Sequence, residues 1–174
     1  MNILSSEGKE TLKAHADMSG EGLTGQAEFT EYEFGEQKVV KITLTLKGNP
    51  EKLKAGKHAV HIHEKGACDC EGFKCAGGHF DPGPGGNSDP DVNHPFHAGD
   101  LPNIIVDEEG NGKLEAITTR VTLSDGPLSL LGKESAPEGT SLMVHGNEDP
   151  YKGGEHGSGI SGGPRLACGT IKKV

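Results

Sequence analysis

Alternation of apolar and polar residues over residues 40–46 is the feature that most limits how this chain can fold. Val40, Ile42, Leu44 and Leu46 are separated by Lys or Thr, and a spacing of two places every apolar side chain on one face of an extended strand. Such a strand buries one face and leaves the other in water, as in antiparallel sheets. Further strands are predicted at residues 11–18, 25–34, 57–64, 103–107, 113–124, 141–145 and 166–172.

Turn-forming residues separate these strands and leave two long irregular stretches. The 174 residues include 28 Gly and 10 Pro, and residues 107–112 are typical of a hairpin turn. Residues 65–102 and 146–165 hold most of the Gly, Pro, Cys and His, and loops of this length in a compact domain are usually functional. Without helical periodicity, a repeat or a linker, we predict one all-β domain over residues 1–174, folded as a sandwich or barrel.

Histidines concentrate in the first irregular stretch and on two predicted strands. In residues 60–63, His61 and His63 alternate with Val60 and Ile62, so both imidazoles point away from the core face. Imidazole suits copper, zinc, iron and nickel, and a carboxylate among imidazoles favours zinc. The sequence predicts a metal site, and we expect two, built from His61, His63, His79, His94, His97, Asp100 and the strand residue His145.

Simpler interpretations apply to the other histidines and to the cysteines. We expect His15, His58 and His156 to be surface residues, because a lone histidine is more often solvated than a ligand. Cys68, Cys70, Cys75 and Cys168 lack the second nearby pair of a zinc ribbon. Disulfides are therefore favoured.

The acidic balance of the chain limits its partners and its location. A formal net charge of −9 repels nucleic acid and anionic membranes, so we predict neither as a partner. No apolar run approaches the roughly 18 residues needed to span a bilayer, and the first residues lack the apolar segment of a signal peptide. With the expected disulfides, this favours a periplasmic or secreted protein whose signal peptide has been removed, with a cytoplasmic location as the alternative.

Five sequence blocks occur in the order seen in copper/zinc superoxide dismutases. The blocks are His61-Ile62-His63-Glu64, Gly77-Gly78-His79-Phe80-Asp81-Pro82, His97-Ala98-Gly99-Asp100-Leu101-Pro102-Asn103, Leu142-Met143-Val144-His145 and Arg165-Leu166-Ala167-Cys168-Gly169. The chain therefore resembles that family over nearly its whole length, and most of all its bacterial branch through residues 64–68 and 98–103. The resemblance implies an eight-stranded antiparallel Greek-key barrel, an immunoglobulin-like sandwich architecture, with two long functional loops.

The resemblance also implies the metal ligands. His61, His63 and His145 match the family's copper ligands, and His79 matches the imidazolate that bridges copper to zinc. His97 and Asp100 match zinc ligands.

Further roles are implied for residues around the metals. Arg165 matches the channel arginine that attracts superoxide, and Asp149 matches a carboxylate that hydrogen-bonds one copper ligand and one zinc ligand. A disulfide between Cys68 and Cys168 is implied, closing a long loop. Cys70 and Cys75 then form a second, small-loop disulfide or remain thiols, and their proximity favours the disulfide.

One position departs from the family pattern. The second zinc histidine usually follows the bridging histidine by eight residues, but Asn87 stands there. His94 is the remaining histidine between His79 and His97, and we predict that a re-routed loop brings it to zinc, with Asp149 linking His94 to His61. In the alternative, His94 is a loop residue and zinc is bound weakly.

The activity implied by the resemblance is conversion of superoxide to dioxygen and hydrogen peroxide at a redox-cycling copper, with His79 and Arg165 as catalytic residues. Zinc then has a structural and tuning role. The alternatives are a copper-binding or copper-delivery protein on the same fold, and a zinc-stabilised structural domain that leaves three histidines unexplained. Both monomers and homodimers occur in the family, and the sequence shows no self-complementary apolar patch that decides between them.

Overall fold

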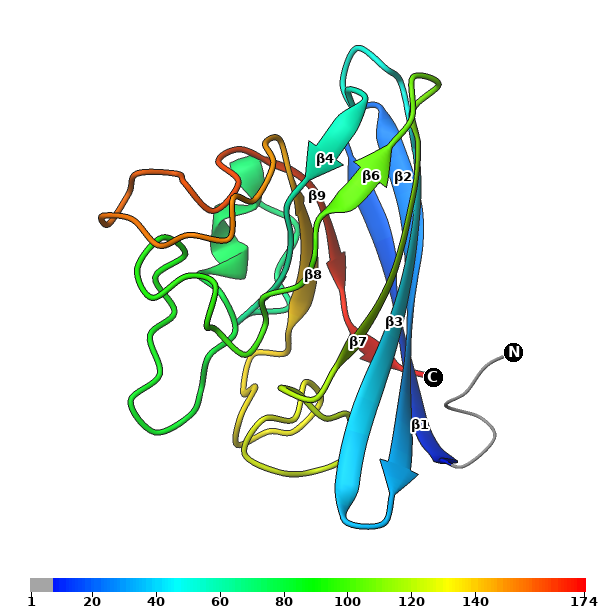
Figure 1. Ribbon diagram of the computed structural model, residues 1–174, viewed down its shortest axis with the longest axis vertical. Coiled ribbons are helices and arrows are strands. Elements are labelled where there is room, and N and C mark those ends of the chain that lie inside the picture. Colours follow the sequence, from blue (N-terminus) through cyan, green and yellow to red (C-terminus); the bar gives the residue numbers. More distant parts are fainter. Residues whose placement is uncertain (1–7) are drawn as a thin grey trace.

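The computed structural model describes residues 8–174 (Figure 1). Within this range the chain forms ten strand segments in one antiparallel sheet and a short 3-10 helix. No helix in the described range is long and apolar enough to cross a membrane. The elements are β1 (Lys9–Gly20), β2 (Leu23–Phe34), β3 (Gln37–Gly48), β4 (Gly56–His58), β5 (Val60–His63), η1 (Glu71–Ala76), β6 (Ile104–Val106), β7 (Asn111–Thr118), β8 (Ser141–His145), β9 (Arg165–Thr170) and β10 (Lys172–Lys173).

The sheet closes on itself at Ala59. The strand order is β4-β6-β7-β3-β2-β1-β9-β8-β5, and its two end segments, β4 and β5, are separated in the chain by Ala59 alone. Ile171 likewise separates β9 from β10. Counting each interrupted pair as one strand, ten segments minus two gives eight strands, with crossovers after β3 and β7 as in a Greek key. The predicted fold class is confirmed.

The core follows the predicted alternation. Val40, Ile42 and Leu44 of β3 are fully buried, and each faces the barrel interior because successive strand residues point to opposite faces. Matching positions of the neighbouring strands complete this core, including Ala14, Ala16, Met18, Ala27, Phe29, Leu114 and Ala116. The hairpin predicted at residues 107–112 joins β6 to β7, and the N–H of Gly110 donates to the carbonyl of Asp107 at 3.2 Å.

Three predicted strands differ from the structure. Residues 57–64 divide into β4 and β5, residues 166–172 divide between β9 and β10, and the strand predicted at 113–124 ends at Thr118. Residues 119–140 form a third long loop, because the buried carboxylate of Glu31 accepts the N–H groups of Leu123 at 2.7 Å and Ser124 at 3.0 Å. These two donors are thereby taken by a side chain instead of a neighbouring strand.

The loops at residues 64–103 and 146–164 lie together on one side of the barrel, beside β8 (Figure 1). β1, β2, β3 and β7 form the wall on the opposite side. Strands β5 and β8, which carry three of the predicted metal ligands, therefore lie beneath these two loops.

Candidate metal centre

The backbone of Ile62 on β5 gathers three chain segments. Its N–H donates to Gly99 at 2.8 Å, its carbonyl accepts from the N–H of Phe80 at 2.9 Å, and Gly99 donates to Phe80 at 2.8 Å. A Cβ at Gly99 would lie 2.4 Å from the carbonyl oxygen of Ile62, so this close approach requires glycine. The residues next to them, His61 and His63, His79, and Asp100, are thereby brought together.

Four buried histidines form the first group, and one ring nitrogen of each lies within 4.8 Å of the others. They are His61, His63, His79 and His145. Within residues 8–174, Nδ1 of His61 and Nε2 of the other three have no hydrogen-bond partner. Leaving a buried polar atom unpaired costs about 1–3 kcal/mol. Four such nitrogens in one place are the donor set of a metal ion.

In His61, His63 and His145, the second ring nitrogen donates a hydrogen bond to a carboxylate or carbonyl oxygen. Nε2 of His61 donates to Asp149 Oδ2 at 2.9 Å, Nδ1 of His63 to the carbonyl of Gly77 at 3.0 Å, and Nδ1 of His145 to the carbonyl of Gly163 at 3.2 Å. Because each partner only accepts, the proton lies on that nitrogen and the other is free as a ligand.

The second group surrounds the carboxylate of Asp100. Its oxygens lie 2.7 Å from Nδ1 of His79, 3.2 Å from Nδ1 of His94 and 2.8 Å from Nδ1 of His97, and Nδ1 of His79 is 3.3 Å from Nδ1 of His97. Ligands at zinc–nitrogen distances of about 2.0–2.1 Å form a tetrahedron with edges of about 3.3 Å. Within the described chain, Asp100 Oδ1 and His94 Nδ1 nevertheless make no aligned hydrogen bond. His97 hydrogen-bonds Asp100 Oδ2, but the short contacts of His79 and His94 with Asp100 are not aligned hydrogen bonds, which fits a shared cation.

His61 and His97 need separate assignment. The mutually close set of four around Asp100 includes His61 and not His97. We assign His61 to the first group, because its Nε2 is engaged by Asp149 while its Nδ1 is unpaired. His97 belongs to the second group through its contacts with Asp100 and His79.

Burial and charge separate the protonation of the two groups. Burial lowers the pKa of His63 and His145 well below the usual value, and burial together with the charge of His61 lowers the pKa of His79 to about 3. For His94, burial is outweighed by Asp100 and Asp149, which raise its pKa to about 9. The first group is therefore neutral at pH 7, as imidazole ligands must be, whereas His94 is protonated at pH 7 and would release that proton on binding a metal.

His94 lies 3.2 Å from Asp100, although it stands seven residues beyond the usual family position at Asn87. Asp89 Oδ1 accepts from the N–H groups of Asp91 at 3.0 Å and Val92 at 3.3 Å, which turns the chain before His94. His94 is buried beside Asp100. The side chain of Asn87, at the usual family position, instead accepts from the N–H of Asp89 at 3.0 Å.

A cavity of about 240 Å³ leads from the surface to His145. Loop 146–164 forms one wall, and Gly162 packs so tightly on His145 that an added Cβ would lie 2.8 Å from the histidine Cβ. Arg165 lines the cavity and donates from Nη1 to the carbonyl of Phe73 at 2.7 Å and from Nη2 to that of Gly77 at 2.6 Å. A small anion entering here meets one guanidinium beside a histidine of the first group.

Asp91 is a functional candidate that the sequence reasoning missed. Its buried carboxylate lines the same cavity and accepts from the N–H groups of Gly159 at 2.9 Å and Ser161 at 3.2 Å. It thereby fastens loop 146–164 to loop 64–103. The signal in the sequence was an aspartate within an irregular stretch, which alone does not separate it from solvated loop acids.

The expectation that His58 is a surface residue is wrong. His58 is only 3% exposed, and its ring nitrogens lie 2.8 Å from the carbonyl oxygens of His145 and Lys54. Its hydrogen bond to the carbonyl of His145 fixes the backbone of that first-group histidine. His156 is exposed as expected, where it pairs with Asp89, and His15 is partly exposed.

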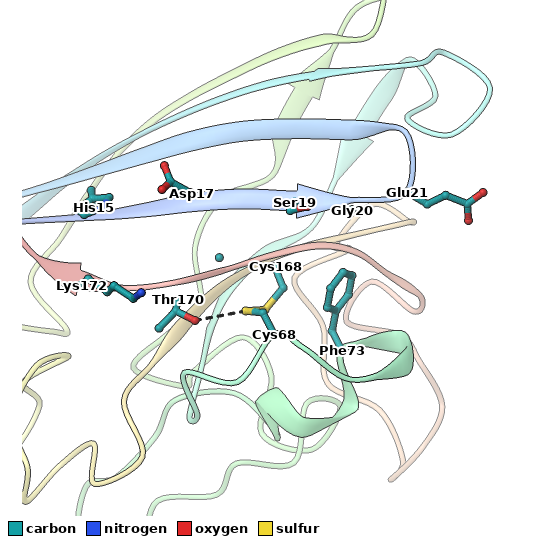
Figure 2. A pocket seen from close by; sticks show the side chains of 11 residues that line it. His15, Asp17, Ser19, Gly20, Glu21, Cys68, Phe73, Cys168, Thr170 and Lys172 are labelled. Atoms are coloured by element: carbon teal, nitrogen blue, oxygen red, sulfur yellow. Dashed lines mark hydrogen bonds between the residues drawn. A yellow bond between two sulfur atoms is a disulfide. The ribbon is translucent and has the colours of Figure 1, made fainter.

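A second hollow, of about 490 Å³, lies between β1, β9 and the disulfide that joins Cys68 to Cys168 (Figure 2). His15, Asp17 and Lys172 line it, and none of the seven clustered metal-site residues does. It is therefore separate from the metal centre.

An eight-stranded Greek-key barrel with a buried histidine cluster able to hold two metal ions is the class of protein that this fold and site define. Residues 23–171 match the family described as copper/zinc superoxide dismutase (SODC). The chain belongs to the copper/zinc superoxide dismutase family.

Individual relatives agree with this assignment. The chain is 38% identical to "Superoxide dismutase [Cu-Zn] 2" of Aquifex aeolicus, covering 98% of this chain and 92% of the relative. It is 36% identical to "Superoxide dismutase [Cu-Zn]" of Deinococcus radiodurans, covering 96% and 87%. A solved structure, the clock protein EA4, superposes with a TM-score of 0.68 at 27% identity and covers 93% of this chain and 94% of that chain. The resemblance to bacterial members is confirmed.

Proposed function

We propose that this single-domain chain converts superoxide to dioxygen and hydrogen peroxide, with copper held by the first group and zinc by the second. The chain's family membership establishes the activity and the two cofactors, and the four unpaired buried nitrogens carry the assignment of the copper ligands. When bound, copper supplies reversible one-electron exchange, which zinc does not. The proposed ligands are His61, His63, His79 and His145 for copper, and His79, His94, His97 and Asp100 for zinc.

Arg165 binds and orients the substrate in this proposal. Its guanidinium lines the cavity that reaches His145 and is fixed by two carbonyl groups. A fixed positive charge attracts a small anion and donates hydrogen bonds to it. This local charge is needed because the net charge of −9 otherwise repels superoxide.

His79 holds and moves a proton. Its Nδ1 is anchored 2.7 Å from Asp100, while its Nε2 is buried and unpaired within the described chain. Nε2 therefore points into the first group, and a proton held there is positioned for transfer to the peroxide that leaves. Asp149 supports both groups through His61 and His94.

We also propose that the protein works outside the cytoplasm. Two disulfides, Cys68–Cys168 and Cys70–Cys75, support this location because such bonds persist in oxidising compartments. A relative from Caenorhabditis elegans, 39% identical over 75% of this chain and 56% of the relative, is named an extracellular superoxide dismutase. Fractionation of cells that produce the protein tests the location, and recovery in the cytoplasm with reduced cysteines would contradict it.

A homodimer is proposed through β6 and β7. Ile105 on β6 and Ile117 on β7 are 64% and 60% exposed, and both lie on the outer face of the barrel, because Ile105 pairs with Lys113 and residues 113, 115 and 117 share a face; a partner on this face would cover both. Sedimentation of the purified protein as a monomer at micromolar concentration would contradict this proposal.

The experiment that tests the function is reconstitution with both metals, followed by elemental analysis and a superoxide-removal assay on the same sample. We expect one copper and one zinc per chain together with activity. Full copper occupancy without superoxide removal would instead favour the copper-binding or copper-delivery alternative.

A further inference from the structure

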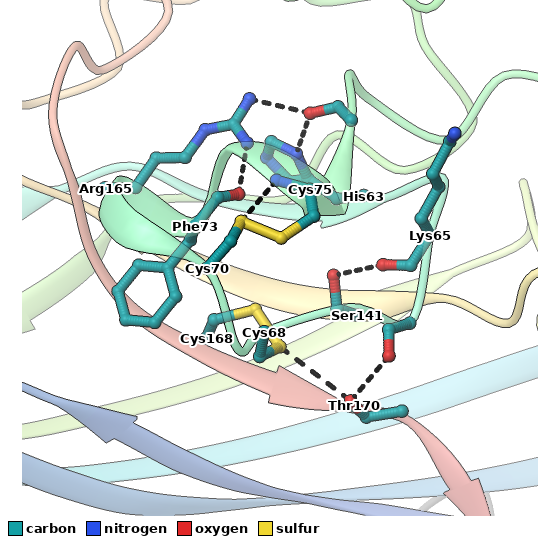
Figure 3. The surroundings of a disulfide bond; sticks show 12 residues. His63, Lys65, Cys68, Cys70, Phe73, Cys75, Ser141, Arg165, Cys168 and Thr170 are labelled. Atoms are coloured by element: carbon teal, nitrogen blue, oxygen red, sulfur yellow. Dashed lines mark hydrogen bonds between the residues drawn. A yellow bond between two sulfur atoms is a disulfide. The ribbon is translucent and has the colours of Figure 1, made fainter.

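Two disulfides lie side by side next to β9, and three of their four cysteines belong to the segment that precedes His79 (Figure 3). Cys68–Cys168 joins the loop to β9 across a sequence separation of 100 and matches the family pattern. Cys70–Cys75 instead closes a ring within the loop itself, across a separation of 5. The small ring encloses residues 71–74 of η1, and the family disulfide does not account for it.

The ring holds the backbone in an unusual conformation. Gly72 and Phe73 have positive φ angles of 64° and 54°, and Phe73, unlike glycine, adopts this left-handed region only at a cost. The N–H of Phe73 donates to the carbonyl of Cys70 at 3.0 Å, and the N–H of Gly77 donates to that of Lys74 at 3.1 Å. A cross-link between the two ends of such a turn opposes its relaxation.

The same ring presents the carbonyl groups that hold the substrate-binding arginine. Arg165 donates to the carbonyl of Phe73 inside the ring and to the carbonyl of Gly77 just after it, at 2.7 and 2.6 Å. The Gly77 carbonyl also accepts from Nδ1 of His63 at 3.0 Å. Figure 3 shows the guanidinium, the His63 ring and the Cys70–Cys75 bond within one contact network.

We propose that the Cys70–Cys75 disulfide is a positioning element that aims Arg165 into the cavity by fixing the carbonyls of Phe73 and Gly77. Without the bond, Phe73 relaxes toward a negative φ, its carbonyl turns away, and the guanidinium loses one of two acceptors. The fold survives, because Cys68–Cys168 still joins the loop to β9. This inference rests on the proposed function of Arg165 as the anion-binding residue.

The test uses four proteins loaded with copper and zinc: the parent, C70S/C75S, R165Q and the triple variant C70S/C75S/R165Q. The dissociation constant of azide, a small anion that binds copper, is measured by visible absorption, with metal content checked by elemental analysis. We expect R165Q to weaken azide binding about tenfold and C70S/C75S about threefold. The triple variant should match R165Q, because a positioning element has nothing to position once the arginine is gone.

A second readout does not depend on copper. Phenylglyoxal modifies arginine side chains, and peptide mapping gives the separate rates at Arg165 and Arg120 in metal-free protein. C70S/C75S should raise the rate at Arg165 about threefold and leave the rate at Arg120 unchanged. K74R, an exposed substitution in the same segment that keeps the charge, is the matched control and should change neither readout.

The outcomes separate the inference from the function on which it rests. If R165Q leaves azide affinity unchanged, the proposed role of Arg165 fails. If R165Q weakens azide but C70S/C75S matches the parent in both readouts, the positioning inference alone is overturned. A triple variant weaker than R165Q overturns it too, because the disulfide then acts through another group.

Discussion

His94 donates from Nε2 to the carboxylate of Asp149, at 2.7 Å to Oδ1 and 2.8 Å to Oδ2. The hydrogen bond turns Nδ1 of His94 toward Asp100, 3.2 Å away. A histidine from a sequence position unusual for the family thereby completes a set of three imidazoles and one carboxylate, which suits tetrahedral zinc.

Replacing His94 tests this assignment. We predict that His94→Ala weakens zinc binding by at least about 100-fold, comparably to His97→Ala, because losing a ligand costs more than losing an outer hydrogen bond. Competition with a chromophoric chelator measures the affinity. Asn87→Ala is the matched control and should bind zinc like the parent. A zinc affinity for His94→Ala equal to that of the parent would show that His94 is not a ligand.

Asp149→Ala should weaken both metals at once. The carboxylate accepts from His61 in one group and His94 in the other, and loss of such a partner typically costs 10–100-fold in metal affinity. Parallel copper and zinc titrations measure this effect. Glu148→Gln, a change at the exposed neighbouring carboxylate, should alter neither affinity; a loss confined to one metal in Asp149→Ala would count against the shared support.

Arg165→Glu should lower the second-order rate constant with superoxide while metal content stays near that of the parent. In the parent, added salt screens attraction and slows the reaction, whereas in the variant it screens repulsion, so the salt dependence weakens or reverses. Rates over a series of ionic strengths measure this change. Lys47→Glu, at an exposed position on β3, makes the same charge change away from the cavity and should have a smaller effect. Equal rates for Arg165→Glu and parent at low ionic strength would refute the steering role.

Glu31 should make stability depend on pH. Burial opposes its charge, but hydrogen bonds from Ser124, Thr11 and Leu123 hold the pKa of Glu31 below its usual value of 4.5. A lowered folded pKa stabilises the protein fully above the unfolded value, and this contribution disappears as the pH falls through the lower folded value.

Glu31→Gln should therefore lower the free energy of unfolding by about 1–3 kcal/mol at pH 7, with a smaller difference from the parent in acid. Urea titrations at several pH values measure both effects. Glu28→Gln, at an exposed position on the same strand, is the control. A difference from the parent that stays constant down to pH 3 would contradict the assignment.

Local periodicity was enough to predict the strands that carry the ligands. Period-two alternation placed His61 and His63 on the same face of one strand, and the structure has both on β5 beneath the loops. The same rule failed at residues 119–124, because Val121 and Leu123 alternate like a strand although Glu31 takes the backbone donors of that segment. A long-range side-chain contact leaves no local periodicity.

The contacts that enclose buried polar side chains were beyond the sequence. His58 was expected at the surface as a lone histidine, although it has the strand parity of the core residues Val60 and Ile62, and the carbonyls of Lys54 and His145 enclose it. The hydrogen bond from Arg165 to the Phe73 carbonyl depends on a left-handed backbone conformation at Phe73. Such a conformation is expected at glycine or asparagine and not at phenylalanine. Most site residues lay within recognisable blocks, with His94 and Asp149 outside them, whereas the contacts that orient the site come from loop geometry.

The central claim is that copper in the first histidine group, and not zinc alone, removes superoxide. The most direct measurement is the second-order rate constant for superoxide removal by protein loaded with copper and zinc, compared with the same protein loaded with zinc only. We predict rapid removal by the first sample and no removal above the buffer rate by the second. Equal rates in the two samples, with copper occupancy verified by elemental analysis, would contradict the account.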